Sequence, residues 1–317
     1  MGNPSELHVI FGTGPLGMAV MRALIAGGKS VRMVSRSGKA DVPPGVTVLA
    51  ADAYNLRDAQ EACAGATVVY QCASPPYHQW PEMFPALQQN ILEGAAKATA
   101  KLIVGENLYM YGEVSDRSIT EDLPYRATTR KGRVRAQMAK AALAAHRSGK
   151  VRVAIGRGSD FFGPGVLESA IGARTILPAL QGKKASLVGN IDLPHTYTFI
   201  NDFGIALATL GEHDSALGQV WHVPNAETLT TREFMTILFR EIGKAPTMGG
   251  MGSLMMRIGG LFIRGARETV EMMYEFEKPF VVDSMKFERT FDQHATPLHE
   301  AIAHTVEWYR HRFSIRP

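Results

Sequence analysis

Cysteine is scarce in this chain, and its scarcity excludes several kinds of cross-linked or metal-bound protein. The 317 residues contain 2 cysteines, Cys63 and Cys72, which are too few for a disulfide framework and follow no zinc-binding spacing. Three histidines, His294, His299 and His304, recur every five residues, a spacing that does not place them on one helix face. We therefore predict no metal site.

Export signals and long apolar runs are lacking as well. Residues 1–6 contain neither a basic segment nor an apolar segment, so we expect no signal peptide. The most apolar late stretch, residues 253–263, contains Arg257 and is too short to span a bilayer. The net charge of +4 is too mild to indicate a general preference for nucleic acid. We expect a cytoplasmic protein that binds neither membrane nor nucleic acid.

A glycine-rich turn near the N-terminus is the first informative feature that is present. An apolar run at residues 7–11 leads into the turn, a helical apolar pattern follows it, and a second apolar run occupies residues 31–34. The turn consists of Gly12, Thr13, Gly14, Pro15, Leu16 and Gly17. Its glycines allow a tight turn, a close approach to a pyrophosphate and close packing of helix on strand. The helix N-terminus then presents N–H groups to the phosphates, so we predict a dinucleotide-binding site.

The end of the second apolar run indicates which dinucleotide is bound. Ser35 and Arg36 stand where an NAD-binding site would carry a carboxylate for the ribose hydroxyl. A guanidinium suits a 2′-phosphate instead, so we predict NADP(H) as the cofactor, with NAD left as the alternative. After the third strand we expect Asp52 and Ala53 beside the adenine, although Asp52 is equally typical of a turn or a helix N-cap.

Strands and helices are predicted in alternation over the first half of the chain. Further apolar runs at residues 46–50, 67–73, 101–104 and 151–155 are separated by helical patterns, one of them over residues 83–100. A later helical pattern predicts a helix over residues 167–180. This alternation predicts an α/β fold with a doubly wound parallel sheet, the Rossmann architecture. Ligands of such sheets bind at the carboxyl ends of the strands. We therefore expect Cys72, Ala73 and Ser74, which end the fourth strand, to contact the cofactor.

Four later segments carry a family resemblance. Residues 105–112 resemble the Ser-Ser-x-x-Val-Tyr-Gly segment of the extended short-chain dehydrogenases/reductases, in the epimerase/dehydratase branch. Residues 119–124 resemble that family's Thr-Glu-Asp-x-Pro loop, residues 156–165 its Arg-x-x-Asn-x-Tyr-Gly-Pro-Gly loop, and residues 195–202 its strand before a helix. The segments occur in the family's order and extend over most of the chain.

This resemblance implies a domain organisation and a set of site residues. It implies an NADP-binding Rossmann core over residues 1–165, to which residues 190–225 return, and a smaller α+β substrate part over residues 166–317. It places the loop at Phe161 beside the nicotinamide. The candidates for substrate contact are Tyr77, Asp160, Phe162 and His195. The alternative for Phe161 and Phe162, and the more usual role of such a pair, is core packing or a hydrophobic pocket wall.

The chain departs from the family pattern at the residues that carry the chemistry. The family uses a Tyr-x-x-x-Lys pair on one helix face, with an upstream Ser or Thr. Here the matching positions hold Lys131, Arg135 and Asn107. Arg135 can hold ribose hydroxyls but cannot exchange a proton at neutral pH. The chain is therefore an atypical member by resemblance.

Proton transfer then has several candidates. Lys131 can serve if burial favours its neutral form, and Tyr109 or Tyr111 can supply a phenol from the end of the fifth strand. Asn107 completes the set of catalytic candidates. The alternatives are a charge on a solvated helix face for Lys131 and a core tyrosine for Tyr111. The stretch from Arg126 to Lys150 has many basic residues and no acidic ones, which suits bound phosphates or a solvated face equally.

Methionine is concentrated late in the chain. Residues 248–280 contain Met248, Met251, Met255, Met256, Met272 and Met273, together with Leu254, Leu261, Phe262 and Phe280. These flexible apolar side chains are typical of core packing or of an irregular apolar pocket. The pocket interpretation implies a substrate that is substantially apolar.

These observations together predict an NADP(H)-dependent oxidoreductase. It would transfer a hydride to or from a carbonyl or an activated double bond of a small, partly apolar substrate. Two alternatives remain open. One is a nucleotide-sugar epimerase or dehydratase, and the other is a non-catalytic redox sensor that binds NADP. The expected partner is a small-molecule substrate, and a homodimer is left open.

Overall fold

The structure is a computed structural model, and it describes residues 6–315 apart from 115, 253–254, 257–267 and 269. The chain divides into two compact units, each of which is made of several segments. The first unit comprises Met1–Met110, Arg130–Gly158 and Phe203–Val223. The second comprises Tyr111–Thr129, Ser159–Asp202 and Pro224–Pro317.

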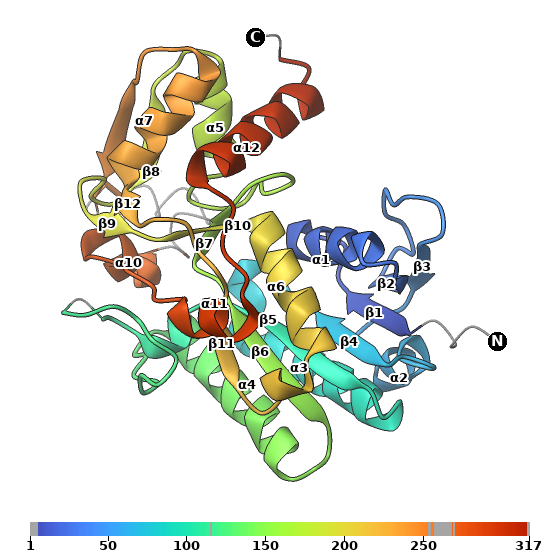
Figure 1. Cartoon of the computed structure of the whole chain (residues 1–317). Coiled ribbons are helices and arrows are strands. Elements are labelled where there is room, and N and C mark those ends of the chain that lie inside the picture. The colour runs from blue at the N-terminus through green and yellow to red at the C-terminus, as the bar shows by residue number, and fades with distance from the viewer. Residues whose placement is uncertain (1–5, 115, 253–254, 257–267, 269, 316–317) are drawn as a thin grey trace. The chain divides into compact units, whose positions relative to one another are not determined.

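A seven-stranded parallel sheet forms the centre of the first unit (Figure 1). Its strands, in spatial order, are β11 (Val220–His222), β6 (Arg152–Arg157), β5 (Lys101–Glu106), β4 (Val68–Gln71), β1 (Leu7–Phe11), β2 (Ser30–Ser35) and β3 (Thr47–Ala50). The order reverses direction at β1, and every neighbouring pair is parallel. The inner strands are apolar on both faces, as a sheet covered by helices on both sides requires.

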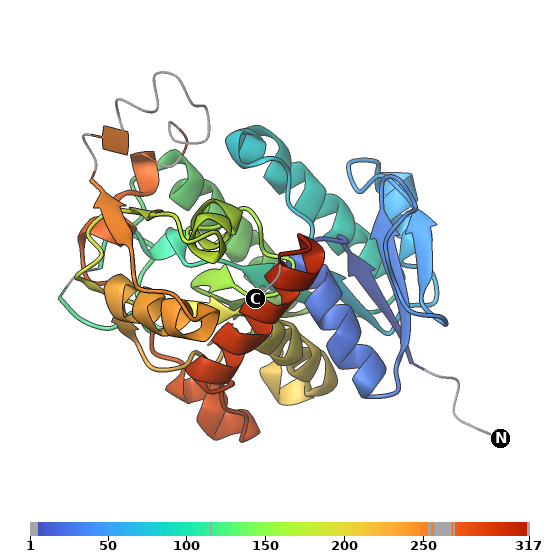
Figure 2. The ribbon, with the colours of Figure 1, turned by 90° about the horizontal axis from the view of Figure 1, so that it is seen from above.

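Helices connect these strands and cover both faces of the sheet. They are α1 (Pro15–Ala26), α2 (Leu56–Ala62), α3 (Trp80–Lys97), α4 (Arg130–Arg147) and α6 (Ile200–Glu212). Figure 2 shows α1 and α3 on opposite faces. Gly204 lets α6 approach α1 closely, because a Cβ atom there would lie 2.5 Å from the Ala19 carbonyl carbon. The predicted doubly wound parallel sheet is confirmed.

Short strand pairs and helices build the second unit. Its strands are β7 (Asp160–Phe162) beside β10 (Tyr197–Phe199), β8 (Ala185–Val188) beside β13 (Met248–Met251), and β9 (Pro194–His195) beside β12 (Leu229–Thr230). Its helices are α5 (Ala173–Leu180), α7 (Thr231–Ile242), α10 (Tyr274–Glu277), α11 (Met285–Phe291) and α12 (Leu298–Arg312). Helices α5, α7 and α12 enclose an apolar core that includes Phe162, Phe234 and Ile302.

Two predicted helices have different boundaries in the structure. The helix predicted to begin at residue 167 begins at Ala173 in the structure. The residues before it make other hydrogen bonds: the Ser169 hydroxyl donates to Phe161 O at 2.8 Å and accepts from Ile171 N at 3.1 Å. Such local bonds compete with the helical ladder. The helix predicted to begin at residue 83 begins at Trp80 instead, because Pro81 is tolerated in a first turn.

The methionine-rich stretch is described only in part. Met256, Met272 and Met273 are buried, and Met255 is exposed. Met248 packs against the apolar core of the second unit. The predicted contributions of Leu254, Leu261 and Phe262 lie outside the described residues. Within the described part of the chain, no helix is long and apolar enough to cross a membrane.

Candidate active site

Two glycines of the N-terminal turn are required by packing within the protein itself. Gly12 has a φ of +109°, and a Cβ atom there would lie 2.8 Å from the backbone nitrogen of Ala73. A Cβ atom on Gly17 would collide with the carbonyl oxygen of Gly12. The turn therefore lies against the end of β4, and α1 packs closely on β1.

Gly14 is different, because within the described part of the chain no atom beyond its immediate neighbours lies within 4 Å of the position of a Cβ atom there. It is the N-cap of α1 in an extended conformation, and Pro15 opens the helix. The first N–H groups of a helix have no intrahelical partner, and no acidic residue occupies this first turn. Open space and N–H donors at the positive end of a helix fit a pyrophosphate. The residues present thus fit the dinucleotide that the turn predicts.

Hydroxyl groups and a cation surround the end of β2. The side chain of Arg36 is exposed, and the Ser35 and Ser37 hydroxyls lie 3.4 Å apart. Backbone N–H groups of Gly38 and Ala51 both donate to Ser35 O, at 3.2 and 3.1 Å, and fix the turn. The structure therefore brings donors that suit a phosphate together around Arg36.

The end of β3 lies close to Arg36. Burial raises the pKa of Tyr54, and the charge of Arg36 opposes that rise, so the guanidinium lies near the phenol. Asp52 Oδ1 accepts a hydrogen bond from Tyr54 N at 3.1 Å, which makes Asp52 a turn residue. The N-cap of α2 is Asn55, so the N-cap interpretation of Asp52 is excluded. Ala53 is buried, and its carbonyl accepts from Asn90 at 3.1 Å.

The residues after β4 connect the glycine turn to an aromatic loop. Cys72 N donates to Phe11 O at 2.9 Å, which aligns this strand end with the end of β1. Burial raises the pKa of the Cys72 thiol, so the thiol stays protonated and is a poor nucleophile. Ser74 is exposed, and Pro75 O accepts a hydrogen bond from Trp80 Nε1 at 3.2 Å, which fixes the loop that carries Tyr77.

Two tyrosines from neighbouring strand ends meet through their hydroxyls. Tyr77 lies in a short 3-10 helix after β4 (Tyr77–Gln79), and Tyr109 lies in another after β5 (Tyr109–Tyr111). Tyr77 Oη donates to Tyr109 Oη at 3.1 Å. Trp80 contacts both rings, with centroid distances of 5.0 Å to Tyr77 and 5.9 Å to Tyr109. Both phenols are half-buried, which leaves them accessible to a small ligand.

Lys131 lies beneath this pair. Its side chain is completely buried, and its Nζ is 4.4 Å from the centroid of the Tyr77 ring. A cation within about 6 Å of a ring face is attracted by the ring quadrupole. The solvated-face alternative for Lys131 is therefore excluded. Four other basic residues of α4, by contrast, point to solvent: Arg130, Arg133, Lys140 and Arg147.

Arg135, one turn further along α4, belongs to a buried charge cluster. Glu106 Oε2 accepts from Arg157 Nε at 3.0 Å, and Glu106 Oε1 lies 3.7 Å from Arg135 Nη2. Arg135 is 2% exposed, and its guanidinium carbon lies 4.7 Å from the centroid of the Phe84 ring. Its Nη2 also donates to Gly105 O at 3.4 Å. Contact of Arg135 with a ribose stays a prediction.

The remaining catalytic candidates occupy different environments. Asn107 Oδ1 accepts from Tyr109 N at 3.4 Å and so supports the tyrosine turn. Tyr111 belongs to the second unit, is 1% exposed, and packs on the Tyr125 ring at 5.8 Å. This burial agrees with the core alternative for Tyr111. Phe162 is likewise a core residue of the second unit, and Phe161 is half-buried beside it on β7.

A second titratable cluster lies within the second unit. His195 Nε2 is 2.9 Å from Asp160 Oδ2, and its Nδ1 is 3.2 Å from Glu275 O. Both ring nitrogens of His195 thus face an oxygen that can accept a hydrogen bond. The imidazole ring stacks on Phe276 at 5.0 Å and on Phe280 at 5.1 Å.

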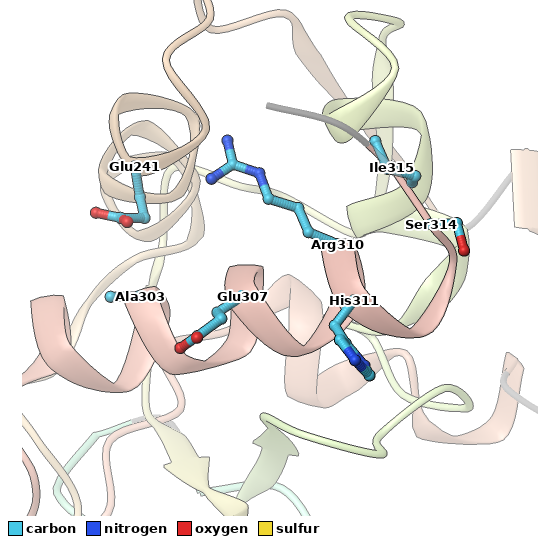
Figure 3. Close-up of a pocket in the computed structure, with 7 residues that line it drawn as sticks. All are labelled: Glu241, Ala303, Glu307, Arg310, His311, Ser314 and Ile315. Atoms are coloured by element: carbon cyan, nitrogen blue, oxygen red, sulfur yellow. The ribbon is translucent and has the colours of Figure 1, made fainter.

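An open hollow on the second unit has no part in these clusters. It lies between α7 and α12 (Figure 3), where its lining consists of Glu241, Ala303, Glu307, Arg310, His311, Ser314 and Ile315. None of the predicted site residues lines it. Among the described residues, no group of histidine, cysteine or acidic side chains is arranged to hold a metal.

Comparison with known proteins identifies the family. Residues 9–223 match the model of the NAD dependent epimerase/dehydratase family. The chain belongs to this family. Its members are oxidoreductase-type enzymes, and the cofactor of the family is a nicotinamide dinucleotide.

Individual relatives resemble the chain in sequence or in fold. Sterol-4-alpha-carboxylate 3-dehydrogenase, decarboxylating, of Bos taurus is 28% identical over 243 residues, 72% of this chain and 67% of the relative. A double mutant of DesIV, the dTDP-glucose 4,6-dehydratase of Streptomyces venezuelae, with NAD bound, has a TM-score of 0.78 at 19% identity, over 98% of this chain and 98% of that one. UDP-N-acetylglucosamine 4-epimerase of Bacillus cereus has a TM-score of 0.76 at 14% identity, over 96% of this chain and 97% of that one. At identities this low, the structural likeness shows that these proteins share the fold of this chain.

The sequence patterns miss three residues of the buried charge cluster and of the cluster around His195. Glu106 and Arg157 form a buried ion pair, and Glu275 is buried beside His195. Glu106 stands next to the family's Ser/Thr position at the end of β5. A charged residue that follows an apolar run so closely is a signal that could have found it. Glu275 lies on the short helix α10 close to Glu277, and its charged sequence surroundings carry no such signal.

Proposed function

We propose that this family member binds NADP(H) and transfers a hydride between it and the carbonyl or carbinol carbon of a small, partly apolar substrate. One observation carries the choice of cofactor. Residues 35–38, at the end of β2, present the Arg36 guanidinium with the Ser35 and Ser37 hydroxyls, and none of these four residues carries a carboxylate. A 2′-phosphate finds charge-assisted donors there, whereas a bare ribose hydroxyl lacks its usual acceptor.

The residues that would hold the cofactor follow the strand ends of the first unit. The pyrophosphate would lie against the glycine turn, which consists of Gly12, Thr13, Gly14, Pro15, Leu16 and Gly17. Ser35 and Arg36 would contact the 2′-phosphate, and Asp52 and Ala53 would lie beside the adenine. The part of the dinucleotide between its two ends would contact Cys72, Ala73 and Ser74. The bound nicotinamide supplies or accepts the hydride. The protein orients the substrate, excludes water and moves the accompanying proton.

Support for an apolar substrate comes from two directions. The bovine relative is named as a dehydrogenase of a sterol carboxylate, a largely apolar alcohol. We propose that the second unit binds the substrate, as the sequence predicts for residues 166–317. This unit carries aromatic side chains around His195. Within this unit, Asp160 and His195 offer the substrate a polar contact beside those aromatic side chains. Contact of the substrate with Tyr77, which belongs to the first unit, stays a separate prediction.

Binding and turnover measured together test the proposal. Fluorescence titration should give a lower Kd for NADPH than for NADH, and oxidation of NADPH should be seen with apolar ketones or aldehydes. Tight binding of a dTDP- or UDP-sugar, with its epimerisation or dehydration, would favour the nucleotide-sugar alternative. NADPH binding without turnover of any carbonyl would favour the redox sensor.

A further inference from the structure

We propose that Tyr109 and Tyr77 form a two-phenol proton relay, with Lys131 as its charge partner, in place of the tyrosine that the family carries on α4. The inference rests on the proposed function and names the group that moves the proton. Three observations support it: the hydroxyl–hydroxyl bond, the position of both phenols at adjacent strand ends, and the buried ammonium group against one of them.

The position of the pair suits a role in catalysis. Strands β4 and β5 are hydrogen-bonded neighbours, and both short helices follow their carboxyl ends. Ligands of a doubly wound sheet bind at that edge. Ala73, between β4 and Tyr77, lies against the glycine turn that would hold the pyrophosphate. The phenols therefore lie on the same edge of the same sheet as the nucleotide cradle.

The direction of the hydrogen bond assigns the two phenols different tasks. Tyr77 Oη donates and Tyr109 Oη accepts, so the hydroxyl proton of Tyr109 is not used in this bond. Tyr109 can pass its own proton to a substrate oxygen while it takes the proton of Tyr77. The negative charge that results then resides on Tyr77.

Lys131 lies where that charge develops. Its ammonium group is 4.4 Å from the centre of the Tyr77 ring, and its side chain is fully buried. Buried charges interact more strongly than solvated ones because the surrounding dielectric constant is lower. The cation therefore stabilises a Tyr77 phenolate. Lys131 is a positioning and electrostatic residue in this scheme, and the two tyrosines are the proton carriers.

The arrangement is held from several sides. Trp80 contacts both phenol rings, and its indole N–H is fixed on Pro75 O at 3.2 Å. Arg135 places its guanidinium carbon 5.7 Å from the centroid of the Trp80 ring. Asn107 accepts from the backbone of Tyr109. Preorganised groups of this kind need little rearrangement when the proton moves.

The reaction step balances in the direction of ketone reduction. The carbonyl carbon gains a hydride with its two electrons, and the C=O π bond breaks as a C–H bond and an O–H bond form. The carbonyl oxygen takes the Tyr109 proton, Tyr109 takes the Tyr77 proton, and a solvent proton later restores Tyr77. The products are the alcohol and the oxidised dinucleotide.

Phenol titration tests the relay without a substrate. The chain has 9 tyrosines, and burial raises the pKa values of Tyr54, Tyr70, Tyr197 and Tyr309, which therefore ionise late. We expect one phenol of the wild type to ionise before the others, detected by tyrosinate absorbance. Tyr77→Phe should remove this early component, and Lys131→Met should move it to higher pH. Tyr125→Phe, the matched control, should leave it in place. An early component that persists in Tyr77→Phe, or that never existed, would overturn the relay.

Kinetics with a carbonyl substrate separate the relay from the proposed function. Tyr109→Phe should lower kcat about 100-fold or more, the usual worth of a general acid, with the Kd for NADPH unchanged. Tyr77→Phe should lower kcat less and shift its pH profile. A wild type that reduces carbonyls while Tyr109→Phe matches Tyr125→Phe would contradict the relay and leave the function standing. A wild type that does not bind NADPH would contradict the function, and the relay with it.

Discussion

Glu106 and Arg157 form an ion pair inside the parallel sheet, with Oε2 and Nε 3.0 Å apart and neither side chain exposed. Arg135 approaches the second oxygen of the same carboxylate from α4. Burial lowers the pKa of Arg135, Glu106 counteracts that effect, and Arg157 reinforces it. Two buried cations thus face one carboxylate at the end of β5, the strand that the short helix with Tyr109 follows.

Glu106→Gln should strongly destabilise the protein. Removal of one partner of a buried ion pair costs about 3–5 kcal/mol in comparable cases, because the remaining charge loses that partner in a low-dielectric interior. Urea denaturation should show this loss in the free energy of unfolding. The control is Glu93→Gln, whose ion pair with Lys150 is partly exposed, so that at most about 1 kcal/mol should be lost. Equal effects in the two variants would contradict the assignment.

Gly14→Ala and Gly17→Ala should separate binding from folding. A Cβ atom on Gly14 meets no non-neighbouring atom among the residues that the structure describes, so the free energy of unfolding should change by less than about 1 kcal/mol. NADPH affinity should nevertheless fall about tenfold or more, because the methyl group occupies the pyrophosphate space. Gly17→Ala should lose about 2 kcal/mol or more of stability, because its Cβ collides with Gly12. Unchanged NADPH affinity in Gly14→Ala would refute the cradle.

Arg36→Asp should reverse the preference between the two dinucleotides. Loss of charge-assisted bonds to the 2′-phosphate removes about 2 kcal/mol, roughly a 30-fold weaker binding of NADPH. NADH binding should be kept or improved, since the new carboxylate can accept from a ribose hydroxyl. Arg57→Asp, at an exposed position on α2, should keep the wild-type preference. If the ratio of the two Kd values is the same in Arg36→Asp and the wild type, the choice of NADP is wrong.

Glu275→Gln should change how stability depends on pH. Burial, reinforced by Asp160, raises the pKa of Glu275 well above its ordinary value of 4.5. The folded state then binds a proton that the unfolded state has released, so this group lowers stability as pH rises above 4.5. Because Gln cannot ionise, the variant should lose less stability than the wild type between pH 5 and neutrality. Glu277→Gln, exposed on the same helix, should follow the wild-type curve, and identical curves for all three proteins would contradict the prediction.

The fold could be predicted from local patterns because parallel sheets need them. Residues 7–34 contain apolar runs of strand length that are separated by a helical pattern. They also contain a glycine turn in which each glycine has a defined role. The start of α5 was mispredicted because apolar periodicity does not reveal the local hydrogen bonds of the Ser169 hydroxyl, which replace the first helical turn.

The candidate site was only partly predictable. Tyr77 and Tyr109 stand 32 residues apart, and no spacing rule couples them. Their contact depends on the adjacency of β4 and β5, which is a property of the whole sheet. Lys131 lies in a basic stretch that suits a solvated face, yet the helix turns this one lysine inward. Sequence reasoning therefore found the individual residues and left their association to the structure.

A crystal structure of the protein with NADPH bound tests the central claim most directly. We expect the 2′-phosphate at Arg36, the pyrophosphate at Gly14, and the hydroxyl of Tyr109 next to the space where a carbonyl oxygen would face the nicotinamide, within the near-attack range of about 3.5 Å. A structure with NADPH in this cradle but with both Tyr77 and Tyr109 remote from the nicotinamide would contradict the account of proton transfer. A nucleotide bound elsewhere would contradict the account as a whole.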